Sequence, residues 1–127
     1  MNIRNSLVLV LIAALLTACA TTPTGRKQLM IVSEDQAISA SAQAYVQTIA
    51  PLEKEGKINS DKALTARVEK ITGRLITEAI VMRPETRDWD WSMKVIDDPE
   101  SVNAWCMAGG KMALYTGLVE KIQPSDD

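Results

Sequence analysis

Residues 89–117, WDWSMKVIDDPESVNAWCMAGGKMALYTG, decide the fold because the hydrophobic pattern changes its period here. Apolar and polar side chains alternate from Trp89 to Val95, which predicts a strand with one buried face. Gly109 and Gly110 can adopt the two positive φ angles of a type I′ turn, so they predict a hairpin. We therefore expect a small antiparallel sheet with a strand over 89–95, a turn over 97–100, and strands over 102–108 and 111–116.

Two amphipathic helices are expected before these strands. Ser33 and Gln36 have the spacing of a capping box at the start of the first helix, and Pro51 is expected to end it. Ser60-Asp61 is expected to cap a second helix over 61–82. The inner stripe of that helix is predicted to consist of Leu64, Val68, Ile71, Leu75 and Met82. Helices followed by a separate run of strands indicate an α+β fold.

The composition excludes several classes of function. The 127 residues carry a formal net charge of −2, so they give no electrostatic footprint for nucleic acid. The sequence contains no histidine, which excludes a histidine-based zinc site and a Ser-His-Asp or Cys-His nucleophile within this chain. The two cysteines cannot build a disulfide framework. We expect Cys106 to be a buried, inert thiol, the alternative being a partner cysteine in sequence beyond residue 127.

The first nineteen residues have the pattern of an export signal. Arg4 precedes an unbroken apolar run over 7–16, which is too short for a transmembrane helix and fits a signal peptide. Leu16-Thr17-Ala18-Cys19 resembles a bacterial lipobox, which implies cleavage before Cys19 and attachment of lipid to that residue. A plain secretory signal with a chance cysteine is the alternative. Ala20, in place of an aspartate, favours the outer membrane over the inner membrane.

The chain is therefore expected to consist of three parts. They are a lipoprotein signal peptide over 1–18, a lipid anchor and tether over 19–32, and a globular part over 33–127. The globular part is expected to be incomplete, because Pro124 to Asp127 have the pattern of a helix start with acidic residues for its first turn. An acidic tail is the alternative interpretation of these last residues.

Two blocks of the chain carry a resemblance to a known family. The first block is Pro23-Thr24-Gly25-Arg26-Lys27-Gln28-Leu29, which runs into Val32-Ser33-Glu34. The second block is Ser101-Val102-Asn103-Ala104, then Gly109-Gly110-Lys111 and Tyr115-Thr116-Gly117-Leu118. They are similar to segments of metallopeptidase family 48, the HtpX- and CaaX-protease-like zinc peptidases, in its bacterial lipoprotein form. The resemblance implies that 33–127 is the N-terminal part of a peptidase domain.

The resemblance implies a zinc site that these residues do not supply. In the family, the next element is a helix with His-Glu-x-x-His, and a later helix adds a glutamate ligand. No catalytic or metal-ligating residue therefore carries over, and we expect zinc in the full-length family member but none bound by this chain. The resemblance further implies a substrate-pairing strand formed by Asn103, Ala104, Trp105, Cys106 and Met107. For Asn103, a turn-end residue that caps its own backbone is the alternative.

Two functions from different classes remain open at this point. In the first, the chain is the scaffold and substrate-strand portion of a lipid-anchored zinc metalloendopeptidase that faces the periplasm and acts on unfolded or misassembled cell-envelope proteins. In the second, it is a complete, small, non-enzymatic lipoprotein that serves as a binding or regulatory module. The DNA beyond codon 127 distinguishes the two. In both, lipidated Cys19 anchors the protein in the bacterial cell envelope, at the outer membrane, and no nucleic acid is a partner.

Overall fold

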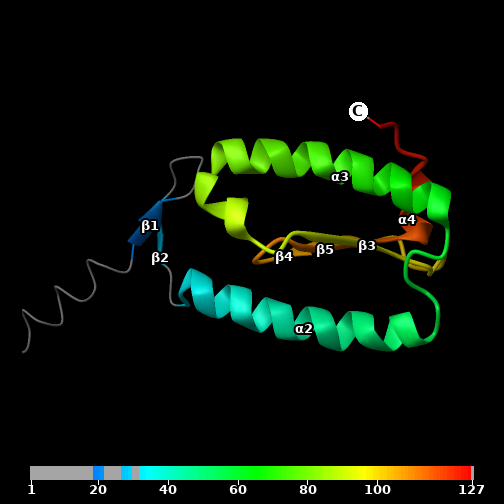
Figure 1. Cartoon of the computed structure of the whole chain (residues 1–127), viewed down its shortest axis with the longest axis horizontal. Helices are drawn as coiled ribbons and strands as arrows, with labels where there is room; N and C mark the ends of the chain where they lie inside the picture. The colour runs from blue at the N-terminus through cyan, green and yellow to red at the C-terminus, as the bar shows by residue number, and fades with distance from the viewer. Residues whose placement is uncertain (1–18, 22–26, 30–31, 127) are drawn as a thin grey trace, which may run out of the picture. The chain divides into compact units, whose positions relative to one another are not determined.

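The structure is a computed structural model, and it describes residues 19–21, 27–29 and 32–126 (Figure 1). The chain divides into two compact units, Met1–Ser33 and Glu34–Asp127. The predicted signal peptide over 1–18 lies outside the described residues.

The first unit contains a short two-stranded sheet. Its strands, β1 (Cys19–Thr21) and β2 (Lys27–Leu29), are antiparallel, with Cys19 opposite Leu29. The described residues contain no helix that combines the length and the apolar character needed to cross a membrane.

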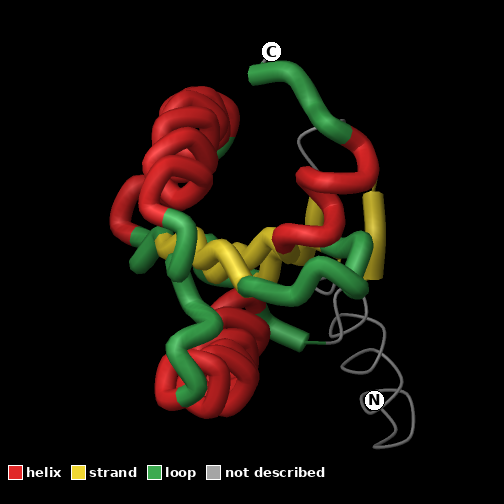
Figure 2. Tube along the Cα trace, turned by 90° about the vertical axis from the view of Figure 1, so that its right-hand side faces the viewer, coloured by secondary structure: helices red, strands yellow, loops and turns green. Residues whose placement is uncertain are grey.

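The second unit is a layered arrangement of helices and strands, so the predicted α+β class is confirmed (Figure 1). Two long helices, α2 (Glu34–Lys54) and α3 (Lys62–Met82), lie on opposite faces of a three-stranded sheet (Figure 2). The remaining elements are η1 (Pro84–Asp88), β3 (Ser92–Ile96), β4 (Ala104–Met107), β5 (Lys111–Tyr115) and α4 (Thr116–Ile122).

The sheet is mixed, and the expectation of a purely antiparallel sheet was wrong. The strand order is β3-β5-β4, with β5 parallel to β3 and antiparallel to β4. The chain leaves β3, passes to the far edge to form β4, and returns as the central strand β5. This order places Ala113 of β5 in the same core cluster as Ile96 of β3, and both are 1% exposed. Burial of these two side chains explains why β5, rather than β4, pairs with β3.

Both faces of the sheet are covered, which corrects the prediction of a single buried face. The neighbouring residues Val95 and Ile96 point to opposite faces, yet they are only 3% and 1% exposed. On the α2 side, Ile96 joins Tyr45, Ile49 and Ala113 in the hydrophobic core. Because α3 packs on the other face, alternation in this strand does not separate a buried side from a solvent side.

The tryptophans before β3 do not belong to the strand that was predicted over 89–95. Residues Pro84–Asp88 form a 3₁₀ helix, and β3 begins only at Ser92. The indole nitrogen of Trp91 donates to the carbonyl oxygen of Thr86 at 2.9 Å, which holds the ring against this short helix. The alternating pattern of Trp89 and Trp91 therefore reflects ring packing, with centroids 5.4 Å apart, rather than extended pairing.

The second helix matches its prediction, whereas the end of the first does not. Asp61 caps α3, since its carboxylate accepts from the backbone nitrogens of Ala63 and Leu64 at 2.9 and 3.0 Å. The first helix begins at Glu34 but continues through Pro51 to Lys54.

A local and a tertiary contact explain why Pro51 does not end α2. Leu52 packs against the hydrophobic core, so another helical turn buries apolar surface. The helix stops where Gly56, at φ 71°, forms a Schellman motif in which Lys57 N donates to Leu52 O at 2.9 Å. Tertiary packing and a glycine cap therefore set the end of this helix.

Candidate functional site

The predicted substrate strand forms an edge of the sheet. β4 pairs with β5 on one side only, and within the described residues no strand pairs with its other side. Tyr115 N donates to Asn103 O at 3.1 Å, so the residues at 103, 105 and 107 direct their backbone groups toward β5. The alternation of an antiparallel ladder then leaves the N–H and C=O groups of Ala104 and Cys106 directed outward.

The side chains of β4 have different surroundings on its two faces. Trp105 and Met107 pack on the α2 side, where the Trp105 and Tyr45 rings meet edge to face at 6.0 Å. Ala104 and Cys106 lie on the α3 side and are exposed. This difference arises because α3 packs over β3, at the opposite edge of the sheet (Figure 2).

The exposure of Cys106 corrects the prediction of a buried thiol. The residue is exposed because the face of β4 on which it lies is not covered by α3. Its thiol donates weakly to Met107 O, with the sulfur 3.7 Å from the oxygen. Partial burial raises the pKa of the Cys106 thiol, so the thiol is protonated at neutral pH and is a weak nucleophile.

A network of hydrogen bonds in the connection over 97–103 positions the start of β4. The Asp98 carboxylate accepts from Ser101 Oγ at 2.6 Å and from Glu100 N at 3.2 Å, and these bonds lower the pKa of Asp98. Thr116 Oγ1 accepts from Asp98 N at 3.0 Å, and Gly117 N donates to Asp98 O at 3.2 Å. The turn predicted over 97–100 is therefore tied to the first residues of α4.

The other end of β4 is held by an ion pair between a buried lysine and an exposed aspartate, which sequence reasoning missed. Lys111, directly opposite Met107, is 8% exposed. Its ammonium donates to the Asp90 carboxylate at 2.6 Å and lies 5.6 Å from the centre of the Tyr45 ring. These contacts compensate a charge that would otherwise be costly to bury. The partner of this lysine lies 21 residues earlier in the chain, too far away for a local sequence pattern to indicate it.

Gly109 and Gly110 form the turn between β4 and β5. Their φ angles are 80° and 79°, the left-handed region that other residues rarely adopt. The connection contains three residues, since Met107 and Lys111 are the last paired residues. A side chain at Gly110 would come within 2.5 Å of the Trp91 ring, so the aromatic packing also requires glycine here.

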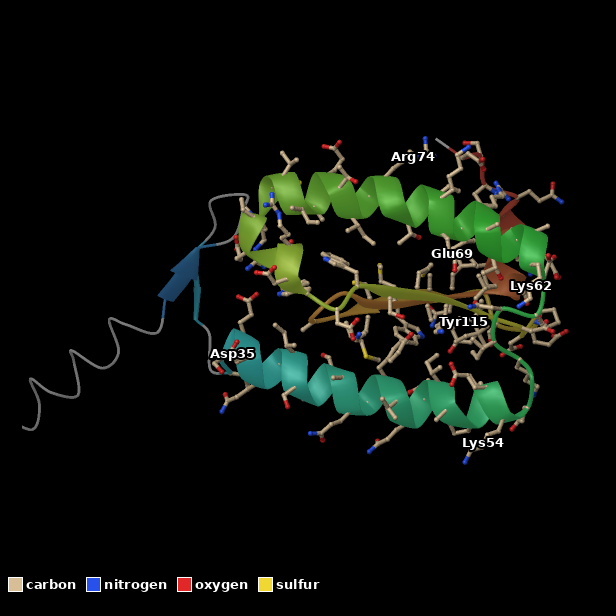
Figure 3. The ribbon with its side chains drawn as sticks, in the orientation of Figure 1. Asp35, Lys54, Lys62, Glu69, Arg74 and Tyr115 are labelled. Carbon is tan, nitrogen blue, oxygen red and sulfur yellow. The ribbon has the colours of Figure 1, made fainter. Side chains whose placement is uncertain are left out.

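An apolar pocket of about 210 Å³ lies on the α3 side of the sheet. The predicted inner stripe of α3 is therefore only partly buried: Leu75 lines the pocket but is 65% exposed, and Met82 is 69% exposed and does not line it. The apolar residues that line it are Leu64, Val68, Ile71, Leu75, Met93, Leu114, Val119 and Pro124. Arg67 and Arg74 of α3 hold the last described residues beside this pocket through Pro124 O and Asp126 O, and Arg74 lies on the outer side of α3 (Figure 3).

The residues present do not fit a catalytic zinc site. Such a site needs three protein ligands, and the sequence has no histidine. Among the described residues no group of three or more cysteine, aspartate and glutamate side chains is placed to hold a metal ion.

The second unit is a domain of α+β class with an open edge strand, and sequence comparison gives its family. The model of the family described as Peptidase family M48 matches residues 62–127, which are 66 of the 127 residues and include α3, the sheet and α4. The chain belongs to peptidase family M48, a family of zinc metallopeptidases, as its resemblance predicted. No curated protein and no solved structure matches the chain.

Proposed function

We propose that this chain is the scaffold and substrate-strand portion of a lipid-anchored zinc metalloendopeptidase that acts on cell-envelope proteins. Membership of peptidase family M48 supports the class of reaction. The observation that carries the role of this chain is the edge position of β4, with its outward backbone groups at Ala104 and Cys106. The zinc ligands belong to sequence other than these 127 residues, because this chain has no histidine to supply them.

Substrate binding then proceeds by strand addition. An extended segment of substrate pairs its own N–H and C=O groups with those of Ala104 and Cys106. Neither side chain is bulky, so both allow close approach of a second backbone. Main-chain hydrogen bonds do not require a particular sequence, which suits unfolded or misassembled proteins as substrates. The loop locked by Asp98 and the ion pair at Lys111 keep β4 extended between two fixed ends.

The substitution Ala104→Pro tests strand addition by removing one outward backbone N–H donor, that of residue 104. Proline removes an N–H that faces away from β5, so the internal ladder is retained, as for prolines on natural edge strands. Loss of one hydrogen bond is worth about 0.5–1.5 kcal/mol, so binding of unfolded casein, measured by fluorescence anisotropy, should weaken roughly 2- to 10-fold. Ala104→Ser keeps the donor and should bind as the wild type does.

Hydrogen exchange supplies a second readout of the same proposal. The amides of Ala104 and Cys106 should gain protection when casein binds, whereas those of Trp105 and Met107, already paired with β5, should not change. Equal binding by the proline and serine variants, with no added protection at 104 and 106, would place the binding site elsewhere.

The anchor is tested separately at Cys19. A cell producing the full chain should incorporate labelled palmitate into the protein, which should then partition with outer membranes. Several acyl chains on one residue anchor a protein far more firmly than one, at about 0.8 kcal/mol for each buried methylene. Cys19→Ala should abolish both labelling and partition, and unchanged labelling in this variant would refute the lipid anchor.

A further inference from the structure

Trp105 lies on the α2 side of the sheet, at its open edge. It is the Cα partner of Ala113 of β5, which is in turn the partner of Lys94 of β3. Its ring meets the Tyr45 ring edge to face, with the centroids 6.0 Å apart. Trp105 is thus the outermost side chain of a row across the sheet, and the next place in that row belongs to a strand added to β4.

The surroundings of Trp105 differ between its inner and outer sides. On the inner side, Tyr45 and Ala113 belong to the hydrophobic core and are 8% and 1% exposed. Trp105 itself is half-buried, and no strand of the described part of the chain lies on its outer side. Its remaining exposed surface is therefore available to a side chain from an added strand.

The backbone geometry places such a side chain close to Trp105. Because the backbone groups of Trp105 are directed toward β5, a residue opposite it in an added antiparallel strand forms a non-hydrogen-bonded pair, with Cα atoms about 4.5 Å apart. This is the closer of the two kinds of antiparallel pair. Ala104 and Cys106 have small side chains on the other face, and residues 102–110 include no charged side chain. Trp105 is therefore the largest apolar side chain that an added strand meets along β4.

We propose that Trp105 is a specificity-determining residue, which selects substrate segments with an aromatic or large aliphatic residue opposite it. This inference rests on the proposed strand addition at β4, and it adds a side-chain preference to recognition by main-chain hydrogen bonds. Pairs of two aromatic residues, or of an aromatic and a β-branched residue, stabilise neighbouring strands. Folded proteins mostly bury such residues and unfolded segments expose them, so the contact at Trp105 favours an unfolded substrate.

A peptide series tests this preference on the wild-type sequence. Each peptide is a serine- and threonine-based segment in which one central residue is phenylalanine, isoleucine, serine, aspartate or lysine. The phenylalanine and isoleucine peptides should bind about 2- to 10-fold more tightly than the serine peptide. The aspartate peptide should bind no more tightly than the serine peptide.

Fluorine NMR of the chain labelled with fluorotryptophan measures these affinities and locates the contact. The Trp105 signal should shift when the phenylalanine peptide binds. The signals of Trp89 and Trp91 are internal controls and should not shift, because these two rings pack against each other before β3.

Substitutions at Trp105 provide matched variants. Trp105→Phe keeps an aromatic ring beside Tyr45 and should retain the preference, whereas Trp105→Ala should bind the phenylalanine and serine peptides equally. Circular dichroism should confirm that both variants are folded. The peptide series on the wild type decides the question even if the alanine variant does not fold.

The outcomes separate this inference from the proposed function. Equal binding of the phenylalanine and serine peptides, by a protein that still binds casein, would overturn the selection at Trp105 and leave strand addition standing. Tightest binding of the lysine peptide would do the same, because it would assign recognition of a cation to the ring. If neither the peptides nor casein bind, strand addition itself is wrong, and the selection at Trp105 is wrong with it.

Discussion

Gly117 lies where the connection over 97–103 packs against the start of α4. A Cβ atom here would overlap Pro99 O and lie 2.6 Å from Ser101 O, and these are backbone atoms that cannot move without the loop. Gly117→Ala should therefore destabilise the protein by roughly 1–3 kcal/mol, measured by urea unfolding.

Gly73 provides the matched control for this substitution. It lies in α3 and is exposed, and a Cβ atom at this position would have no neighbour within 4 Å outside its own helix backbone. Gly73→Ala should therefore stabilise the protein by about 0.5–1 kcal/mol through helix propensity. Equal effects of the two alanines would contradict the close packing at Gly117.

Asp98 makes the same connection sensitive to acid. The Ser101 hydroxyl and two backbone amides lower the pKa of its carboxyl below the ordinary value of about 3.9. A lowered folded-state pKa contributes stability that is present above the unfolded value and is lost as the pH falls through the folded value. Ser101→Ala should thus be less stable than the wild type at pH 7, and the difference should shrink at a pH well below the ordinary carboxyl value of about 3.9. Urea midpoints at the two pH values check this, and a constant difference would argue against Asp98 as the cause.

At the scale of elements, the start of α3 depends on one side chain. Asp61 accepts from two backbone N–H groups that have no helical partner. Asp61→Ala should lower the free energy of unfolding by about 1 kcal/mol, whereas Asp61→Asn retains an acceptor and should lose much less. Thermal unfolding of both variants measures the difference. If the asparagine variant falls as far as the alanine variant, the charge rather than the cap is responsible.

At the scale of the whole molecule, the side chains available as metal ligands limit which reactions this chain can catalyse. The chain has no histidine, and the described residues hold no cluster of three oxygen or thiol ligands. The 127-residue protein, dialysed against zinc and then buffer, should retain no stoichiometric zinc of catalytic type and should not cleave unfolded casein. Metal analysis and a protease assay check both statements. Cleavage by this chain that a chelator abolishes would contradict them.

Several local features of this protein were predictable from its sequence. The pair Ser60-Asp61 was predicted as a cap, and Asp61 is the residue that caps. The second helix was placed at 61–82 because helix starts and apolar periodicity depend on residues within a few positions of each other. The turn at 97–100 followed from its aspartates and proline. The family was predicted from short motifs, and the model of that family matches residues 62–127.

The tertiary structure alone decided which strands and faces meet. Nothing near β3 in sequence specifies that β5 rather than β4 pairs with it, since that choice depends on burial of Ile96 and Ala113 against α2. Pro51 remains inside α2 because Leu52 reaches the core. Cys106 is exposed because α3 covers the opposite edge of the sheet. Sequence patterns are local, whereas strand order, helix ends and exposure depend on contacts between residues far apart in the chain. Those long-range contacts formed the candidate site.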